Sequence, residues 1–202
     1  MRFSTKLPVV AMSGLLMVAV SAAEARAPQE APAPAAAATA PNPAVGGAAM
    51  DAAKPITENA AAAPNLTTLV KAVKAAGLDA TLSGPGPFTV FAPTNDAFGR
   101  LAAGTVDTLM KPENKATLAK VLTYHVVPGI ITLEQLKQKM TAGGGTTTLT
   151  TVEGATLTVT DLNGAIQLTD ANGNKSYVEV PDVRQSNGVV HVVNGVLLPK
   201  LG

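Results

Sequence analysis

The chain has 202 residues, with 15 lysine and arginine side chains against 14 aspartate and glutamate side chains, so its formal net charge is only +1. A balance this even gives no long-range attraction for phosphate backbones or anionic lipid surfaces, and we therefore expect no nucleic-acid partner. The sequence contains no cysteine, which excludes a disulfide framework and a lipid-modified cysteine.

The N-terminal residues have the layout of a secretory signal peptide. Arg2 and Lys6 give a positive start, an apolar stretch runs from Leu7 to Val20, and small residues follow. This stretch is shorter than the roughly 20 residues that a membrane-spanning helix needs. We predict a signal peptide over residues 1–25, cleaved between about residues 22 and 27, and a secreted or periplasmic protein with no membrane span after cleavage.

The next segment differs in composition from the rest of the chain. Residues 26–54 are dominated by alanine, proline and glycine. A tract of this kind has few bulky side chains to bury, so it cannot offset the entropy lost when its backbone is ordered. We therefore expect an Ala/Pro-rich disordered tether over residues 26–54, followed by one folded domain over residues 55–202.

The first half of this domain has helical patterns with recognisable ends. Apolar residues recur at three- and four-residue spacing between Asn65, the expected N-cap, and Gly77, the expected C-terminal stop. Thr94 and Thr105 are expected to cap two further short helices, and Thr132 opens a capping-box pattern. The predicted helices cover residues 57–63, 66–76, 95–101, 106–110, 113–123 and 133–140.

In the second half the apolar period changes from helical to two, with threonines interleaved among the apolar residues. This alternation is typical of strands with one buried and one solvated face. Strands are predicted over residues 88–92, 124–127, 146–151, 155–160, 165–169, 177–180 and 188–198. Helices followed by an antiparallel meander indicate an α+β fold class.

Two segments about a hundred residues apart, Phe88–Phe98 and Gly188–Pro199, are near-continuous apolar runs that carry polar residues. Together with Tyr124–Gly129 between them, they resemble the two signature boxes and the Tyr-His motif of the fasciclin (FAS1) domain family. The resemblance covers roughly Pro55 to Leu201. It implies a fasciclin-like fold, an antiparallel β-sheet wedge or sandwich packed with several short helices, and an adhesion module without cofactors.

His191 lies in the middle of the second apolar run, where a buried polar ring must be hydrogen-bonded. The resemblance implies that the two signature boxes lie side by side. Thr94, Asn95 and Asp96 of the first box are then the expected partners of His191 in a structural polar network. Helix-capping duties at Thr94 and Asp96 are the competing explanation for these polar residues.

Four residues are candidates for contact with a partner. In the family the Tyr-His pair, here Tyr124 and His125, is implicated in adhesion and receptor binding. Asp182 and Val183 resemble an integrin-recognition stretch of some animal fasciclin domains, although Arg184 stands where those motifs carry an apolar residue. Animal integrin binding is therefore not expected, but Asp182 and Val183 remain candidates for an exposed contact loop. The alternative is that all four residues serve packing and turns.

Catalysis has little support in the sequence. No Gly-x-Ser-x-Gly is present, and the two histidines do not share a metal-ligand spacing such as His-x-x-x-His. The glycine-rich segments lack the lysine and the strand–helix context of a phosphate loop. We expect no catalytic residues, no metal site and no cofactor.

The sequence favours a non-catalytic exported adhesion or interaction module that contacts matrix, biofilm or cell-surface protein or polysaccharide. One alternative is a periplasmic small-ligand or envelope-stress binding protein, and a deep apolar pocket between helices and sheet would favour it. A second alternative is a minor hydrolase, which requires a serine or threonine within hydrogen-bond reach of a histidine.

Overall fold

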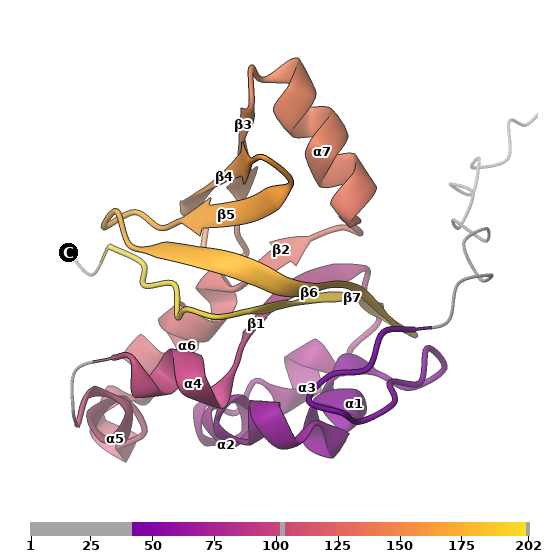
Figure 1. Cartoon of the computed structure of the whole chain (residues 1–202). Coiled ribbons are helices and arrows are strands. Elements are labelled where there is room, and N and C mark those ends of the chain that lie inside the picture. Colours follow the sequence, from indigo (N-terminus) through magenta and orange to yellow (C-terminus); the bar gives the residue numbers. More distant parts are fainter. Residues whose placement is uncertain (1–41, 102–103, 201–202) are drawn as a thin grey trace, which may run out of the picture. The chain divides into compact units, whose positions relative to one another are not determined.

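The computed structural model describes residues 42–101 and 104–200, so the predicted signal peptide and residues 26–41 of the predicted tether lie outside the described residues. The described helices are α1 (Ile56–Ala62), η1 (Pro64–Leu66), α2 (Thr67–Ala76), α3 (Asp79–Leu82), α4 (Asn95–Gly99), α5 (Thr105–Leu109), η2 (Pro112–Asn114), α6 (Lys115–Tyr124) and α7 (Leu133–Ala142). The described strands are β1 (Phe88–Pro93), β2 (Val126–Pro128), β3 (Thr146–Thr150), β4 (Thr156–Leu162), β5 (Ala165–Thr169), β6 (Lys175–Gln185) and β7 (Gly188–Val193) (Figure 1).

The strands form a seven-stranded sheet in the order β2-β1-β7-β6-β5-β4-β3. β1 and β7 run parallel, in a register that places Phe91 beside His191, and the other neighbouring pairs are antiparallel. The two signature boxes therefore lie side by side, and the α+β class is confirmed. The parallel pair also explains why these two segments are near-continuous apolar runs, because both of their faces are covered.

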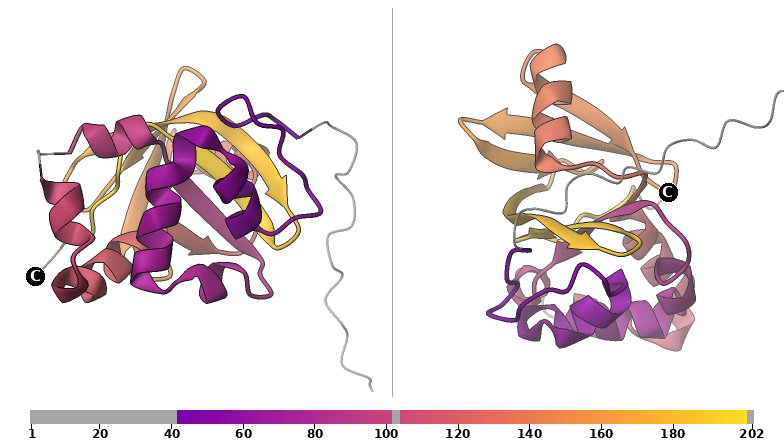
Figure 2. Two further views of the ribbon diagram at one scale, coloured as in Figure 1. Left: turned by 90° about the horizontal axis from the view of Figure 1, so that it is seen from below. Right: turned by 90° about the vertical axis from the view of Figure 1, so that its right-hand side faces the viewer.

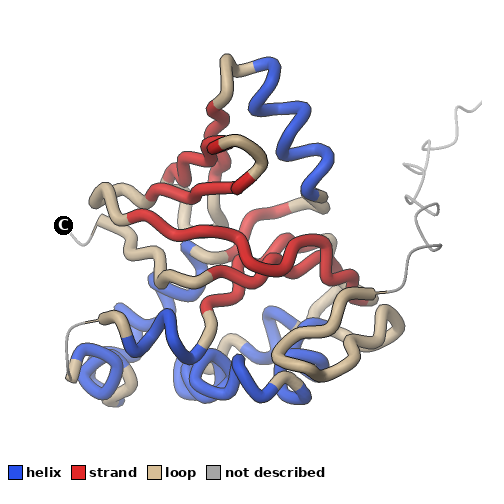
Figure 3. Tube along the Cα trace, in the orientation of Figure 1, coloured by secondary structure: helices blue, strands red, loops and turns tan. Residues whose placement is uncertain are grey.

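The β1–β7 pair separates two apolar cores. Val90 and Val190 belong to the first core, together with buried residues of α1 and α2 and the buried aliphatic residues of α6. Phe91 and Val193 belong to the second, together with the buried residues of α7 and β3 to β5. Figures 1 and 3 show α1 to α5 on one side of this strand pair and α7 on the other, beside β3 and β4. Strand alternation thus sends successive side chains of one strand into different cores.

Several helix ends match the local signals in the sequence. The Thr94 hydroxyl accepts a hydrogen bond from the Ala97 N–H at the start of α4. Thr132 and Gln135 form a reciprocal capping box at the start of α7, which satisfies two backbone donors of the first turn. Gly77 ends α2 with a φ of 72°, a left-handed conformation that glycine adopts without strain.

Two predicted caps are wrong. The Asn65 side chain does not cap α2, because the chain enters this helix through the turn η1. The cap comes instead from a residue distant in sequence, since the Asn95 Oδ1 accepts a hydrogen bond of 2.9 Å from the Thr68 N–H. Thr105 does not cap α5 either, because the helix begins at Thr105 itself and Gly104 precedes it in a left-handed conformation.

The largest strand differences occur next to the predicted site residues. The strand predicted over 124–127 begins at Val126, because α6 extends through Tyr124. β6 covers 11 residues instead of the predicted four, and its pairing with β7 shifts at a bulge that contains Pro181 and Asp182. Asp182 has a φ of 55°, which is uncommon for a residue other than glycine. The bulge allows a strand to contain a proline that cannot donate to the ladder.

The predicted disordered tether is wrong for its last residues, 42–54, which pack on the domain. We call residues 42–54 the strap. Val45 and Met50 are only 1% and 7% exposed, and both belong to the first core. Gly46 and Gly47 adopt positive φ in the turn between them. The two bulky apolar side chains of the strap therefore anchor an otherwise small-residue segment in the first core.

The strap runs beside β6 (Figure 2). Backbone and side-chain hydrogen bonds hold it there. The Asn42 amide donates to the Arg184 carbonyl and accepts from the Arg184 N–H, both at 2.7 Å. The Ser186 N–H donates to the Lys54 carbonyl at the other end of the strap. The folded domain therefore begins at or before Asn42, earlier than the predicted start at Pro55.

Candidate functional site

His191 is completely buried, and backbone groups hold its ring. Its Nε2 donates to the Ile131 carbonyl at 2.8 Å, and its Nδ1 accepts from the Asp182 N–H at 3.3 Å. The ring also stacks on Phe91 with a centroid distance of 5.5 Å. This pair of bonds requires the neutral ring protonated on Nε2. His191 therefore fastens two loops, the one after β2 and the β6 bulge, to the centre of the sheet.

The predicted partners of His191 lie elsewhere. Thr94 caps α4, Asn95 caps α2 and bonds to the Pro64 carbonyl, and Asp96 is exposed. The prediction of one network joining these residues to His191 is wrong. The β1–β7 register explains why, because His191 lies opposite Phe91 and the polar residues of the first box follow the end of β1.

Tyr124 and His125 are also interior residues, 0% and 2% exposed. The Tyr124 hydroxyl donates to the Thr156 carbonyl and accepts from the Ala171 N–H, so it joins the end of α6 to β4 and to the turn after β5. The expectation that these two side chains form a contact surface is wrong. Their position at a helix–strand junction suggested exposure, but the junction lies between the two cores.

The His125 ring joins α6 to the C-terminal segment. Its Nδ1 donates to the Val121 carbonyl at 2.7 Å, and its Nε2 accepts from the Leu197 N–H at 3.0 Å. His125 is thus protonated on Nδ1, the opposite tautomer to His191. In each ring one nitrogen donates to a carbonyl and the other accepts from an N–H. A second proton on the ring would therefore lie against another N–H, where no acceptor is present.

Burial shifts the acid–base properties of these three side chains. Desolvation lowers the pKa of His125 to about 4, although hydrogen bonding to Val121 opposes the shift. Desolvation also lowers the pKa of His191. Burial raises the pKa of Tyr124. Both histidines are therefore neutral at pH 7, because the charged form loses its hydration in the interior.

Asp182 and Val183 have different environments. Val183 is 1% exposed and belongs to the first core, so its prediction as an exposed contact is wrong. Asp182 is half-buried, and its Oδ1 accepts from the Leu133 N–H at 2.7 Å. This bond links the β6 bulge to the first residue of α7, next to the loop after β2 that His191 holds.

A partly apolar surface lies on these two linked loops. Ile130 is 36% exposed, Pro128 is exposed, and Pro181 and Asp182 are half-buried. We call Pro128, Ile130, Pro181 and Asp182 the bulge surface. Sequence analysis identified only Asp182 of this group, because exposure of single apolar residues in turns has no periodic signal.

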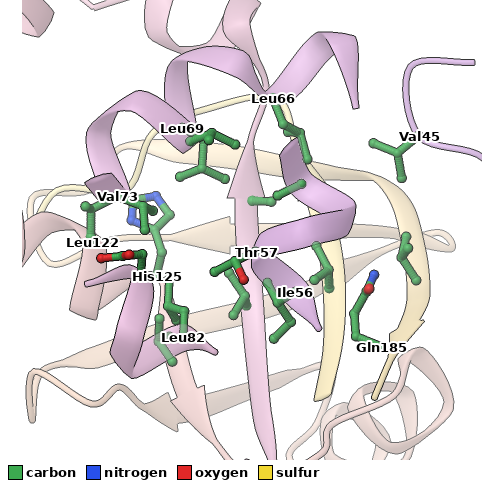
Figure 4. A pocket seen from close by; sticks show the side chains of 18 of the residues that line it. Val45, Ile56, Thr57, Leu66, Leu69, Val73, Leu82, Leu122, His125 and Gln185 are labelled. Atoms are coloured by element: carbon green, nitrogen blue, oxygen red, sulfur yellow. The ribbon is translucent and has the colours of Figure 1, made fainter. Parts of the chain in front are cut away.

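A second feature is an apolar pocket between helices α1 to α3 and strands β1, β6 and β7, with an empty volume of ≈ 760 Å³ that includes its open side. Figure 4 shows Leu66, Leu69 and Val73 on the helix side, with His125 and Gln185 also on its wall. Val45 of the strap lines it too. A concave and mostly aliphatic lining of this kind is typical of small-molecule sites, and no periodic signal in the sequence marks its position.

The polar side chains inside this pocket have partners. The Gln185 Oε1 accepts from the Asn59 amide, and both His125 ring nitrogens are bonded to backbone groups. Thr57, Lys74 and Asp79 supply the other polar groups of the lining.

The hydrogen bonds of both histidines go to backbone atoms, with no serine or threonine hydroxyl among their partners. Among the described residues, no group of three or more His, Cys, Asp or Glu side chains could hold a metal ion. Over the same residues, no helix has the length and apolarity to cross a membrane.

Comparison with known proteins gives consistent matches. A family model described as "Fasciclin domain" matches residues 64–199. The chain is 48% identical over 154 residues to protein sll1483 of Synechocystis sp., covering 76% of this chain and 78% of that protein. It is 35% identical over 150 residues to immunogenic protein MPB70 of Mycobacterium bovis, with 72% and 69% covered. It is 37% identical over 131 residues to transforming growth factor-beta-induced protein ig-h3 of Sus scrofa, covering 65% of this chain but 17% of that protein.

A solved structure has the same fold. It is a FAS1 domain pair from the insect cell adhesion molecule fasciclin I, and it matches with a TM-score of 0.64 at 20% identity, covering 72% of this chain and 51% of that one.

Proposed function

Because the chain belongs to the fasciclin domain family, we propose that it is an exported, non-catalytic adhesion module for protein or polysaccharide of a cell surface, matrix or biofilm. A signal peptide directs its export, and the mature chain begins between about residues 22 and 27, which N-terminal sequencing checks. Membership in a family with a cell adhesion molecule among its structures supports this role.

We place the partner contact on the bulge surface. Ile130 supplies an apolar side chain that is 36% exposed, and Asp182 supplies a carboxylate that is bonded to the Leu133 N–H of the same chain segment. Apolar and charged anchors held in fixed geometry are the groups that dominate protein interfaces. Asp182 is the member of the predicted contact set that keeps access to solvent, and it is the observation on which this proposal depends.

The buried histidine has an indirect part in this contact. His191 bonds to the Ile131 carbonyl and to the Asp182 N–H, so one ring holds the backbone next to both anchors. Rigid loops lose less entropy on binding than mobile ones. The signature histidine thus positions the bulge surface and does not touch the partner.

The geometry gives little support to the minor hydrolase. A general base needs a nucleophile within hydrogen-bond reach, but the ring nitrogens of His125 and His191 are bonded to backbone groups. The small-ligand alternative has support from the apolar pocket between the helices and the sheet.

The test is capture of cells and matrix from the protein's own culture by the immobilised mature protein. We expect the double variant Ile130→Ser/Asp182→Asn to lose roughly 2 kcal/mol or more of binding free energy. Asparagine tolerates positive φ and retains an oxygen for the Leu133 N–H, so the fold should persist. A change of thermal unfolding equivalent to at most about 0.5 kcal/mol per substitution is expected.

The matched control is Leu162→Ser/Asp161→Asn in the β4–β5 hairpin. Leu162 is 44% exposed, and the Asp161 Oδ1 accepts from the Gly164 N–H, so this pair imitates the chemistry of the test pair on another surface. Equal loss of capture in both variants would remove the bulge surface from the site. Unchanged capture in the folded test variant would do the same.

A further inference from the structure

We propose that the apolar pocket between α1, α2, α3 and the sheet is a binding site for one uncharged amphiphile, a molecule with an aliphatic body and a hydroxyl or similar neutral polar end. This property is separate from the adhesive contact on the bulge surface. The pocket lies on the helix side of β1 and β7, and the linked loops of the bulge surface lie outside its lining.

The body of the ligand follows from the pocket wall. Leu66, Leu69 and Val73 project from the helix side, and Val90 and Val190 form the floor on the sheet. Aliphatic side chains of this kind offer dispersion contacts and no directional bonds. A flexible aliphatic chain or ring can fill such a space, and its transfer from water is the driving force.

No polar group of the ligand is expected in the interior. His125 lines the pocket, but the Val121 carbonyl and the Leu197 N–H occupy its two ring nitrogens. The Gln185 oxygen is occupied by Asn59. A ligand hydroxyl placed against these three atoms would lose its water without gaining a partner, which costs free energy.

The polar end of the ligand is set by the exposed part of the lining. Lys74 and Asp79 are both exposed and both line the pocket. Thr57 lies there too, and its hydroxyl is 2.8 Å from that of Ser83. One cation and one anion together give a charged group no net attraction, whereas a hydroxyl can donate to Asp79 and accept from Lys74, so the pair favours a neutral polar end.

The strap takes part in closing the site. Val45 and Met50 line the pocket from residues 42–54, and both are buried. A ligand in the pocket would therefore contact the strap as well as the helices. We expect ligand binding to stabilise the folded state, because anything that binds only the native state raises the free energy of unfolding.

The test uses the mature protein and the neutral apolar dye N-phenyl-1-naphthylamine, whose fluorescence rises in apolar sites. The chain has no tryptophan, so background emission is low. Ala60→Phe places a ring in the pocket and should weaken dye binding at least tenfold. The matched control Ala75→Phe changes an exposed alanine on α2 and should leave dye binding within twofold of the unmodified protein.

The class of ligand is tested by displacement of the dye with 1-octanol, octanoate and octylammonium. We expect octanol to displace it at concentrations at least fivefold lower than either charged compound. Stronger displacement by a charged compound would overturn the neutral-ligand assignment. Dye binding that is unchanged in folded Ala60→Phe would overturn the site itself.

If Ala60→Phe does not fold, methyl chemical shifts of the unmodified protein give the second measurement. Octanol should shift methyl signals of Leu69, Val90 and Val190, and should leave those of Leu157 and Leu168 in the second core unchanged. Shifts absent from the first group would overturn the proposal. Capture of cells by Ala60→Phe is expected to stay normal, so failure of this proposal and failure of the adhesive function are distinguishable.

Discussion

The two faces of the central β1–β7 pair carry cores of different construction. The second core is built from large side chains, among them Phe91, Tyr124, Leu157 and Leu168, each at 0% exposure. The first core contains five buried alanines, Ala63, Ala72, Ala76, Ala92 and Ala97. The apolar pocket is lined on this alanine-containing side. The pocket thus lies on the face that has more small side chains, and Ala60 of α1 and Ala92 of β1 are among its lining residues.

Each face also has one buried histidine. His125 lines the pocket on the first face, and His191 stacks on Phe91, which belongs to the second core. The two rings have opposite tautomers, and each joins backbone segments distant in sequence. The comparison teaches that the polar signature residues of this family act here as interior connectors on both faces, one on the wall of the pocket and one beside the filled core.

The difference between the two cores predicts that a leucine-to-alanine substitution lowers the free energy of unfolding by different amounts on the two faces. Leu168→Ala in the filled core should destabilise the protein by about 4 kcal/mol, because its neighbours cannot collapse into the cavity. Leu69→Ala, which enlarges an existing pocket, should cost about 2 kcal/mol because fewer contacts are lost. Urea unfolding of both variants measures the difference, and equal costs would show that the first core is packed as tightly as the second.

The buried histidines predict a loss of stability in acid. The folded-state pKa of His125 is about 4, below its unfolded value of about 6.5, so the unfolded chain binds the proton first as pH falls. The stabilisation is complete above pH 6.5 and is lost as pH falls toward 4, a decrease of roughly 3 kcal/mol in the free energy of unfolding. His191 acts in the same direction.

Urea unfolding at pH 7.5, 6.0, 5.0 and 4.0 measures this loss. The comparison variant is His125→Gln, whose side-chain oxygen can accept from the Leu197 N–H and does not titrate near neutral pH. This variant is expected to be less stable at pH 7.5 and to lose less stability between pH 6.5 and 4. Identical pH profiles for the two proteins would show that His125 is accessible to protons in the folded state.

Local signals in the sequence predicted local structure well. Thr94, Thr132 and Gly77 act as predicted because their partners lie within a few residues of them. The side-by-side position of the two signature boxes followed from the family resemblance, and the structure has it.

The errors concern contacts made over long sequence separations. Asn95 replaces Asn65 as the cap of α2 from the far side of β1. The burial of Tyr124 and His125 depends on two cores that meet at the end of α6, which no sequence period reports. The pocket depends on how α1, α2 and α3 pack against β1, β6 and β7, and spacing within one helix does not reveal this.

A last substitution, in the strap, tests whether the first core extends beyond the helices. Val45→Ser/Met50→Ser removes its two buried apolar side chains. Full burial of each is worth about 1.5–3 kcal/mol, but a detached strap regains backbone entropy. The net loss should therefore be about 2 kcal/mol, less than the sum of the two side chains.

The matched control is Ala44→Ser/Ala49→Ser, because both alanines are exposed positions of the same strap. It should change the free energy of unfolding by less than about 0.5 kcal/mol. A loss below that value in the test variant would show that the strap contributes nothing and that the domain begins at Pro55, as composition alone suggested. A loss above about 4 kcal/mol would show that the strap cannot detach without unfolding the domain. The expected loss of about 2 kcal/mol would show that residues 42–54 stabilise the first core but can detach while the rest of the domain stays folded. Dye binding should also weaken in the same variant, because Val45 and Met50 line the pocket.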